Sequence, residues 1–155
     1  MRMLSRVAER LYWMARYLER AEDTARLVMA YQHIIMDIPK GSEPGWDVLI
    51  SILDANPVFN ERYRAANEQN VLKFLIADLD NVSSIPSSIK AARENVRTTR
   101  DVLPEEAWEM VNELYLYGRR RLTSPTMHKN RHRIMSEIIA RCQRTTGLLS
   151  GAMSH

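Results

Sequence analysis

The first 28 residues carry an apolar repeat that limits the chain to a helical fold. A repeat of 3.5 residues is typical of a long helix that packs lengthwise on other helices. We therefore expect an all-α protein, a helical bundle with long antiparallel helices, in a single domain over residues 1–155. The repeat consists of Leu4, Val7, Leu11, Met14, Leu18, Ala21, Ala25 and Val28.

Composition agrees with this fold class. The 155 residues include five glycines, and alanine, leucine, arginine, glutamate and methionine are common, as in helical proteins. No signal peptide opens the chain, and no apolar run approaches the ~18 residues of a membrane span. The single cysteine, Cys142, shares a helix face with apolar residues and is interpreted as a buried thiol. We expect a cytoplasmic protein without a membrane association.

Caps and prolines divide the rest of the chain into further helices. Asn67 or Asn70 can cap one helix, and Ser83 or Ser84, followed by Pro86 in the first turn, can cap another. Pro39 and Gly41 end the first helix, and residues 123–130 form a loop before the last. The predicted helices cover about 4–38, 48–53, 57–63, 70–79, 84–102, 105–122 and 131–149.

One carboxylate interrupts the apolar repeat of the first helix. Glu22 falls about 20° from Leu11 on the helical wheel, so a core-facing stripe carries an acid that must be paired or protonated. Tyr12, Arg16, Glu19, Asp23 and Arg26 share its sector. On the helix predicted at 84–102, Arg93, Arg97 and Arg100 form a basic stripe, so packing these two helices would set acids against arginines.

Three interpretations of this polar edge stay open. The first is a network of ion pairs that fixes helix register. The second is an anion or peptide-terminus site built from Arg16, Arg93 and Arg97, since arginine forks suit carboxylate and phosphate. The third is a metal site at Glu19 and Glu22, which the histidine spacing disfavours; we expect no metal and no cofactor. His128 and His132 are interpreted as a solvated pair that straddles the 123–130 loop.

Charge is unevenly distributed along the chain. Residues 1–115 hold 14 Lys and Arg against 18 Asp and Glu, a net charge of −4, whereas residues 116–155 hold eight against Glu137 alone, a net charge of +7. The basic quarter is not interleaved with stacking aromatic residues, so nucleic acid is not the expected partner.

The segment MLSRVAERLYWMARYLERAEDTARLV closely resembles the opening of the bacterial alpha-E domain family. The resemblance continues through DNVSSIPSSIKAARENVRTTRD and EEAWEMVNELYLY. It implies an all-helical fold, and a context beside circularly permuted ATP-grasp proteins and transglutaminase-like proteases. The acid and arginine positions of the family correspond here to Glu19, Arg20, Glu22, Arg26, Arg93, Glu94, Asn95 and Arg97.

The resemblance also implies a second half. Members of the family run to about twice this length, so we expect the N-terminal half of a two-repeat bundle that self-associates or joins a second-half chain. The expected function is a non-catalytic helical binding module of an ATP-grasp-linked peptide-ligating or peptide-modifying system. The alternatives are an enzyme that acts on peptide or amino-acid amides through Glu22 and the arginines, and nucleic-acid binding by the basic quarter.

Overall fold

The computed structural model describes residues 2–42 and 44–153. Within these ranges the chain forms seven α-helices and one short 3-10 turn, and no strand, so the all-α prediction is confirmed. The elements are α1 (Arg2–Asp37), α2 (Asp47–Ile52), α3 (Asn56–Arg62), α4 (Glu68–Ile76), α5 (Ile85–Thr98), η1 (Arg100–Val102), α6 (Glu105–Arg121) and α7 (Met127–Met153).

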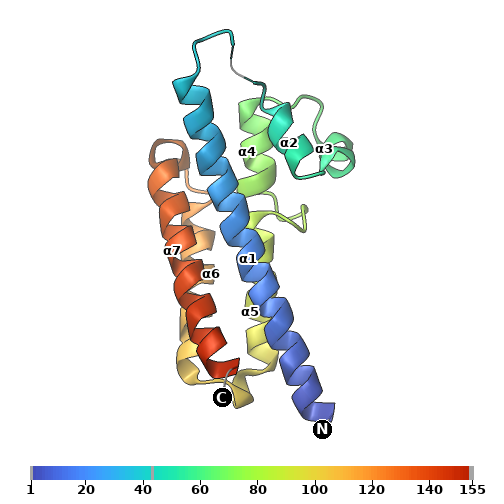
Figure 1. Cartoon of the computed structure of the whole chain (residues 1–155), viewed down its shortest axis with the longest axis vertical. Helices are drawn as coiled ribbons and strands as arrows, with labels where there is room; N and C mark the ends of the chain where they lie inside the picture. The colour runs from blue at the N-terminus through green and yellow to red at the C-terminus, as the bar shows by residue number, and fades with distance from the viewer. Residues whose placement is uncertain (1, 43, 154–155) are drawn as a thin grey trace.

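Four long helices build the bundle. The 36 residues of α1 give it a length of about 54 Å, and it packs against both α5 and α7. Helix α6 contacts α5 and α7 on the opposite side, and neighbouring helices run antiparallel (Figure 1). Helix α4 continues the line of α5 toward the far end of α1, with α2 and α3 beside it (Figure 1). The predicted bundle of long antiparallel helices is therefore present.

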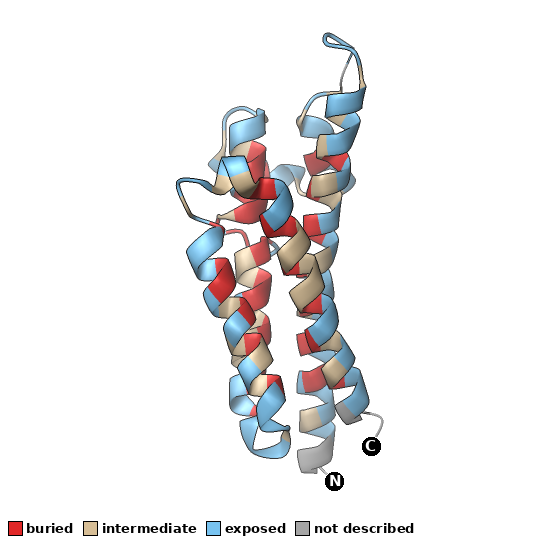
Figure 2. Ribbon diagram, turned by 90° about the vertical axis from the view of Figure 1, so that its left-hand side faces the viewer, coloured by how far each residue is buried: buried red, intermediate tan, exposed pale blue. Residues whose placement is uncertain are grey.

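The apolar repeat of α1 forms the centre of the core. Its members from Leu11 to Val28 are buried, and they face similar stripes on α5, α6 and α7 (Figure 2). The repeat on α5 is buried from Ile85 to Val96. Cys142 is fully buried among the apolar residues of α7, as the sequence indicated. The side chain of Leu4 lies outside the described residues.

Two predicted helix starts are confirmed in detail. The Asn67 side chain accepts a hydrogen bond from the Asn70 backbone N–H at 2.8 Å, which caps α4. The Ser84 hydroxyl accepts one from the Ser87 N–H at 3.2 Å, and Pro86 stands in the first turn of α5. Each cap satisfies a backbone donor that the first turn of a helix leaves free.

Several predictions about element ends are wrong. The helix predicted at 84–102 ends at Thr98 and is followed by a separate 3-10 turn, Arg100–Val102, so Arg100 lies outside α5. The last helix begins at Met127, not at 131, because the Thr126 carbonyl already accepts helical hydrogen bonds from the N–H groups of Lys129 and Asn130. His128 and His132 therefore lie on one helix and do not straddle a loop. Helix α4 ends at Ile76, and Leu79, predicted as one of its apolar residues, is 60% exposed in the following turn.

Candidate functional site

Glu22 lies at the edge of the core that faces α7. Its side chain is 19% exposed and accepts a hydrogen bond from Arg26 Nε at 2.9 Å. Burial, with a smaller contribution from the Glu22 charge, raises the pKa of the nearby Cys142 thiol to about 12. Near neutral pH the thiol is therefore protonated and inert, and the carboxylate is paired along its own helix.

The other polar residues of the predicted α1 sector face solvent. Arg16 Nη1 donates to Glu19 at 3.2 Å, and both side chains are at least half exposed. Asp23 is exposed, and the Tyr12 ring makes an edge contact with Trp13. An exposed pair at this spacing contributes little to stability.

Arg93 on α5 and Arg100 in the turn after it have partners on another helix, α6. Arg93 donates from Nε to Asn112 at 3.0 Å, and its guanidinium lies 4.6 Å from the Tyr115 ring centre. The Arg100 guanidinium lies 4.6 Å from the ring centre of Trp108. These cation–π contacts fasten α5 and the turn after it to α6 rather than to α1.

The remaining members of the α5 stripe make local contacts. Arg97 pairs with Glu94 at 2.9 Å one turn earlier. The Asn95 amide donates to the Ala91 carbonyl at 3.0 Å. Along the described part of the chain, no ion pair joins α1 to α5; Arg10 Nη1 on α1 instead donates a hydrogen bond to Thr98 Oγ1 on α5 at 2.6 Å. Glu19 and Glu22 of α1 thus pair within their own helix. Of the arginines considered for an anion site, Arg16 pairs with Glu19, whereas Arg93 and Arg97 both pair with Glu94.

Exposed aromatic residues gather on the outer side of α1. The Trp13 ring lies 5.5 Å from that of Tyr12 and 6.2 Å from that of Tyr17, and the Arg20 guanidinium covers the Tyr17 ring at 5.8 Å. Tyr12 is 53% exposed and Trp13 44%. We call these four residues, Tyr12, Trp13, Tyr17 and Arg20, the α1 aromatic surface. Large exposed aromatic side chains beside arginine are typical of residues that dominate protein–protein binding.

A cavity of about 290 Å³ adjoins this surface at Arg20. It lies between α1 and the short helices, and two of its apolar residues, Val58 and Val82, are 45% and 77% exposed. The remaining residues that line it are Thr24, Leu53, Asp54, Ala55, Phe74, Leu75, Asn81 and Ser83. The α1 aromatic surface therefore continues into a depression with apolar walls.

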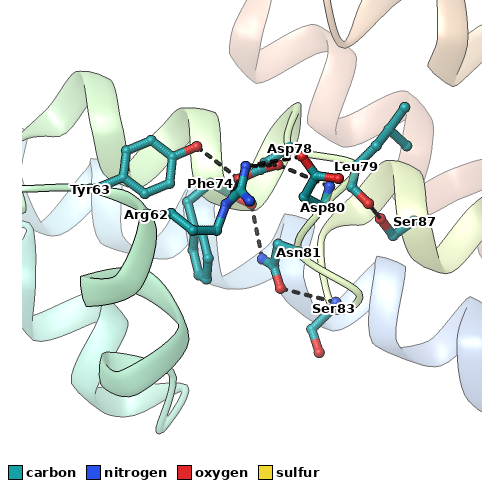
Figure 3. Close-up of polar contacts among 9 residues, drawn as sticks. All are labelled: Arg62, Tyr63, Phe74, Asp78, Leu79, Asp80, Asn81, Ser83 and Ser87. Atoms are coloured by element: carbon teal, nitrogen blue, oxygen red, sulfur yellow. Dashed lines mark hydrogen bonds and ion pairs between the residues drawn. The ribbon is translucent and has the colours of Figure 1, made fainter.

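A buried carboxylate holds the wall of this cavity in place. Asp78 accepts hydrogen bonds from Arg62 Nε at 2.9 Å, from the Tyr63 hydroxyl at 2.9 Å and from the Asp80 backbone N–H at 3.0 Å (Figure 3). Asn81 donates to the Phe74 carbonyl and accepts from the Ser83 N–H. We call Asp78, Arg62, Tyr63 and Asp80 the Asp78 cluster. It connects the end of α3 to the turn between α4 and α5.

The hydrogen bonds of the Asp78 cluster outweigh its burial. Burial alone would raise the pKa of the Asp78 carboxyl, but the bonds from Tyr63, Asp80 and Arg62, with the Arg62 charge, lower it below its ordinary value. Burial and the bond to Asp78 raise the pKa of Tyr63 to about 12. At neutral pH the Asp78 carboxylate is therefore ionised and accepts these hydrogen bonds, as a structural contact requires.

Sequence reasoning missed Asp78, Arg62 and a buried arginine, Arg131. Arg131 donates to Gln32 on α1 and to Glu68 on α4. Arg62 is the last residue of α3 and Asp78 lies in the turn after α4, so no periodicity links them. For Arg131 the sequence did offer a signal, because this arginine lies on the apolar side of the last helix, three residues before Ile134.

The described residues hold no cluster of three or more His, Cys, Asp or Glu side chains that suits a metal ion. The nearest approach of two histidines in a ring contact is His33 against His132, edge to face with 5.8 Å between ring centres. Across the same residues, no helix has the length and apolarity needed to cross a bilayer.

The sequence profile of the Alpha-E family, described as a predicted alpha-helical domain with a conserved ER motif, matches residues 3–155. The comparisons found no significant match among curated proteins or among solved structures. The dipeptide Glu-Arg occurs in this chain at Glu9–Arg10, Glu19–Arg20 and Glu61–Arg62. Because the profile covers nearly the whole chain, the protein belongs to the Alpha-E family.

Proposed function

We propose that this chain is a non-catalytic helical binding module of a bacterial ATP-grasp-linked peptide-ligating or peptide-modifying system, active in the cytoplasm. The family membership and the ATP-grasp context implied by the resemblance support the choice of system. The observation that carries the binding role is the α1 aromatic surface, where Trp13 and Tyr12 leave about half of their area to solvent.

The chemistry of this surface suits a protein partner. Removing a tryptophan and a tyrosine ring from water is favourable, and their few rotatable bonds make the entropic cost of ordering them low. Arg16 and Arg20 beside the rings supply charge that can meet acidic groups of a partner. The adjoining cavity with Val58 and Val82 extends the apolar contact area.

The polar edge offers less to a catalytic role. Glu22, the acid considered as a catalytic group, holds Arg26, and Cys142 is buried with a raised pKa. A general base or nucleophile needs access to substrate as well as a suitable pKa. These features favour a binding module over an enzyme that acts on amides.

The test is binding of the purified chain to the ATP-grasp protein encoded in the same genome, measured by calorimetry. We expect a complex that Trp13→Ala weakens by about tenfold or more, the loss typical of a dominant interface residue. Leu116→Ala is the matched control, because Leu116 is 46% exposed on α6 and should leave affinity unchanged. Absence of a complex at micromolar concentrations, or equal affinity of both variants, would contradict the proposal.

Self-association is a second part of the proposal. Ile34 and Met36, near the end of α1, are 47% and 72% exposed, and a second copy or a second-half chain can cover them. We expect light scattering to give a mass above that of the 18.0 kDa chain, and Met36→Glu to lower it. A mass of one chain at all concentrations would refute this part.

A further inference from the structure

Arg131 is a charged side chain buried where three helices meet. Its side chain is 7% exposed. Nε donates to Gln32 on α1 at 3.1 Å, and Nη2 donates to Glu68 on α4 at 3.3 Å, while Arg131 itself belongs to α7. The guanidinium is therefore fixed in position by elements far apart in the sequence.

The positive charge of Arg131 is only partly balanced. Gln32 is neutral, and the Glu68 side chain is 48% exposed, so water screens its charge. A guanidinium carries five N–H donors and keeps its charge at all accessible pH values. Among the described residues, no hydrogen-bond acceptor takes the N–H groups of Nη1. A buried cation in this state favours an anion beside it.

A groove of about 440 Å³ opens next to Arg131, between α4 and the start of α7. Its apolar lining comes from Leu72, Ile76, Leu122 and Met127. Lys73 and His128 add further basic groups, against one acid, Glu68. The volume lies within the range of pockets that hold small organic ligands.

The neighbouring cavity lengthens the groove. It has a volume of about 250 Å³ and shares Ala77 and Leu122 with the first. Lys90 and Arg119 line it together with apolar side chains, and it lies between α5 and α6. The two cavities thus offer an apolar path along which basic groups are placed, and α7 directs its positive end toward the first of them.

We propose that the Arg131 groove binds an organic carboxylate that carries an apolar body. The planar guanidinium matches a carboxylate fork, and a single negative charge offsets the excess of the Arg131 and Lys73 cations over the Glu68 anion. The apolar body lies along Leu72, Ile76 and Leu122. Peptide C-termini and short acyl chains both have this chemistry. The proposal does not depend on an ATP-grasp partner, because the residues of the α1 aromatic surface do not line this groove.

The test is a titration of the chain followed by NMR, with the Arg131 Nε–H and the Met127 methyl as local reporters. The probes are N-acetyl-leucine, hexanoate, N-acetyl-leucine amide and acetate. Both apolar carboxylates should shift the two reporters in a saturable way, and the one that binds more tightly identifies the source of the ligand. The neutral amide and acetate should each bind at least about tenfold more weakly than the apolar carboxylates, because the amide lacks the negative charge and acetate lacks the apolar body.

Two variants and one control localise the site. Arg131→Met should abolish the carboxylate preference, and Lys73→Met, at an exposed position that is safe for folding, should weaken binding several-fold. Arg133→Met is the control, because Arg133 is exposed on the same helix and pairs with Asn130 outside the groove. Equal binding of the amide and the acid, reporters that do not move, or Arg131→Met binding like wild type would each overturn the proposal.

Discussion

Asp78 and Arg131 are two buried charges near the α4 end of the bundle, and their surroundings differ. Asp78 is surrounded by donors from Arg62, Tyr63 and the Asp80 backbone. Arg131 has one neutral partner and one half-exposed acid, and it lines a groove. The first charge is satisfied within the protein, whereas the second has donors to spare.

The difference separates a structural charge from one suited to binding. Loss of Asp78 removes a common acceptor from three groups, so the turn between α4 and α5 loses its attachment to α3. Loss of Arg131 leaves only groups that water can reach, because Glu68 is half exposed. The comparison therefore predicts different costs for two substitutions at similarly buried residues.

The largest effect is expected for Asp78→Ala. The free energy of unfolding should fall by about 3 kcal/mol, because hydrogen bonds to a charged group contribute more than neutral ones and several are lost together. Urea unfolding followed by circular dichroism measures it. Asp80→Ala is the matched control, since the Asp80 side chain also contacts Arg62 but is 78% exposed. A similar loss in both variants would show that the Asp78 cluster is not the stabilising element.

Acid should weaken the Asp78 cluster in a defined direction. The pKa of Asp78 is lower in the folded protein than in the unfolded chain, so the carboxylate contributes stability that is fully present above its unfolded value. This contribution is lost as the pH falls below about 4, through the folded pKa. The free energy of unfolding of Asp78→Asn should fall less steeply than that of wild type between about pH 4 and pH 2. Parallel pH profiles would contradict this assignment.

A smaller effect is expected for Tyr63→Phe. The substitution removes one donor to Asp78 and keeps the ring contacts with Phe59 and Phe74, so the free energy of unfolding should fall by about 1.5 kcal/mol. Its ultraviolet titration provides a second readout. The wild-type protein should show one tyrosine that ionises near pH 12, and the variant should lack it. If Tyr63→Phe still shows an ionisation near pH 12, that ionisation belongs to another tyrosine and the assignment to Tyr63 is wrong.

The sequence contains most of the information about the fold. The 3.5-residue repeat of α1 predicted the buried face from Leu11 to Val28. Two helix starts were each predicted as one of two capping residues, of which Asn67 and Ser84 form the caps. These features are local, and a local pattern needs no knowledge of the partner helix. The start of α7 was misplaced because Ser124 and Pro125 are typical turn residues. The turn that contains them ends at Thr126, and the helix begins at Met127.

The sites were less accessible to sequence reasoning. The basic stripe on α5 was visible, but its partners on α6, Trp108 and Tyr115, depend on which neighbour each side of α5 faces. Arg131 and Gln32 are 99 residues apart, and Arg62 at the end of α3 shares no repeat with Asp78 in the turn after α4. Tertiary contacts of this kind have no periodic signature, so only the folded chain brings them together.

The most direct test of the distinction between the two buried charges is the free energy of unfolding of Arg131→Met, measured by urea beside Asp78→Ala. Replacing a buried, incompletely paired cation with an apolar side chain of similar length is often neutral, so Arg131→Met should lie within about 1 kcal/mol of wild type. Asp78→Ala should lie about 3 kcal/mol below it. If Arg131→Met loses as much stability as Asp78→Ala, Arg131 is a structural charge and the account of the open groove is wrong.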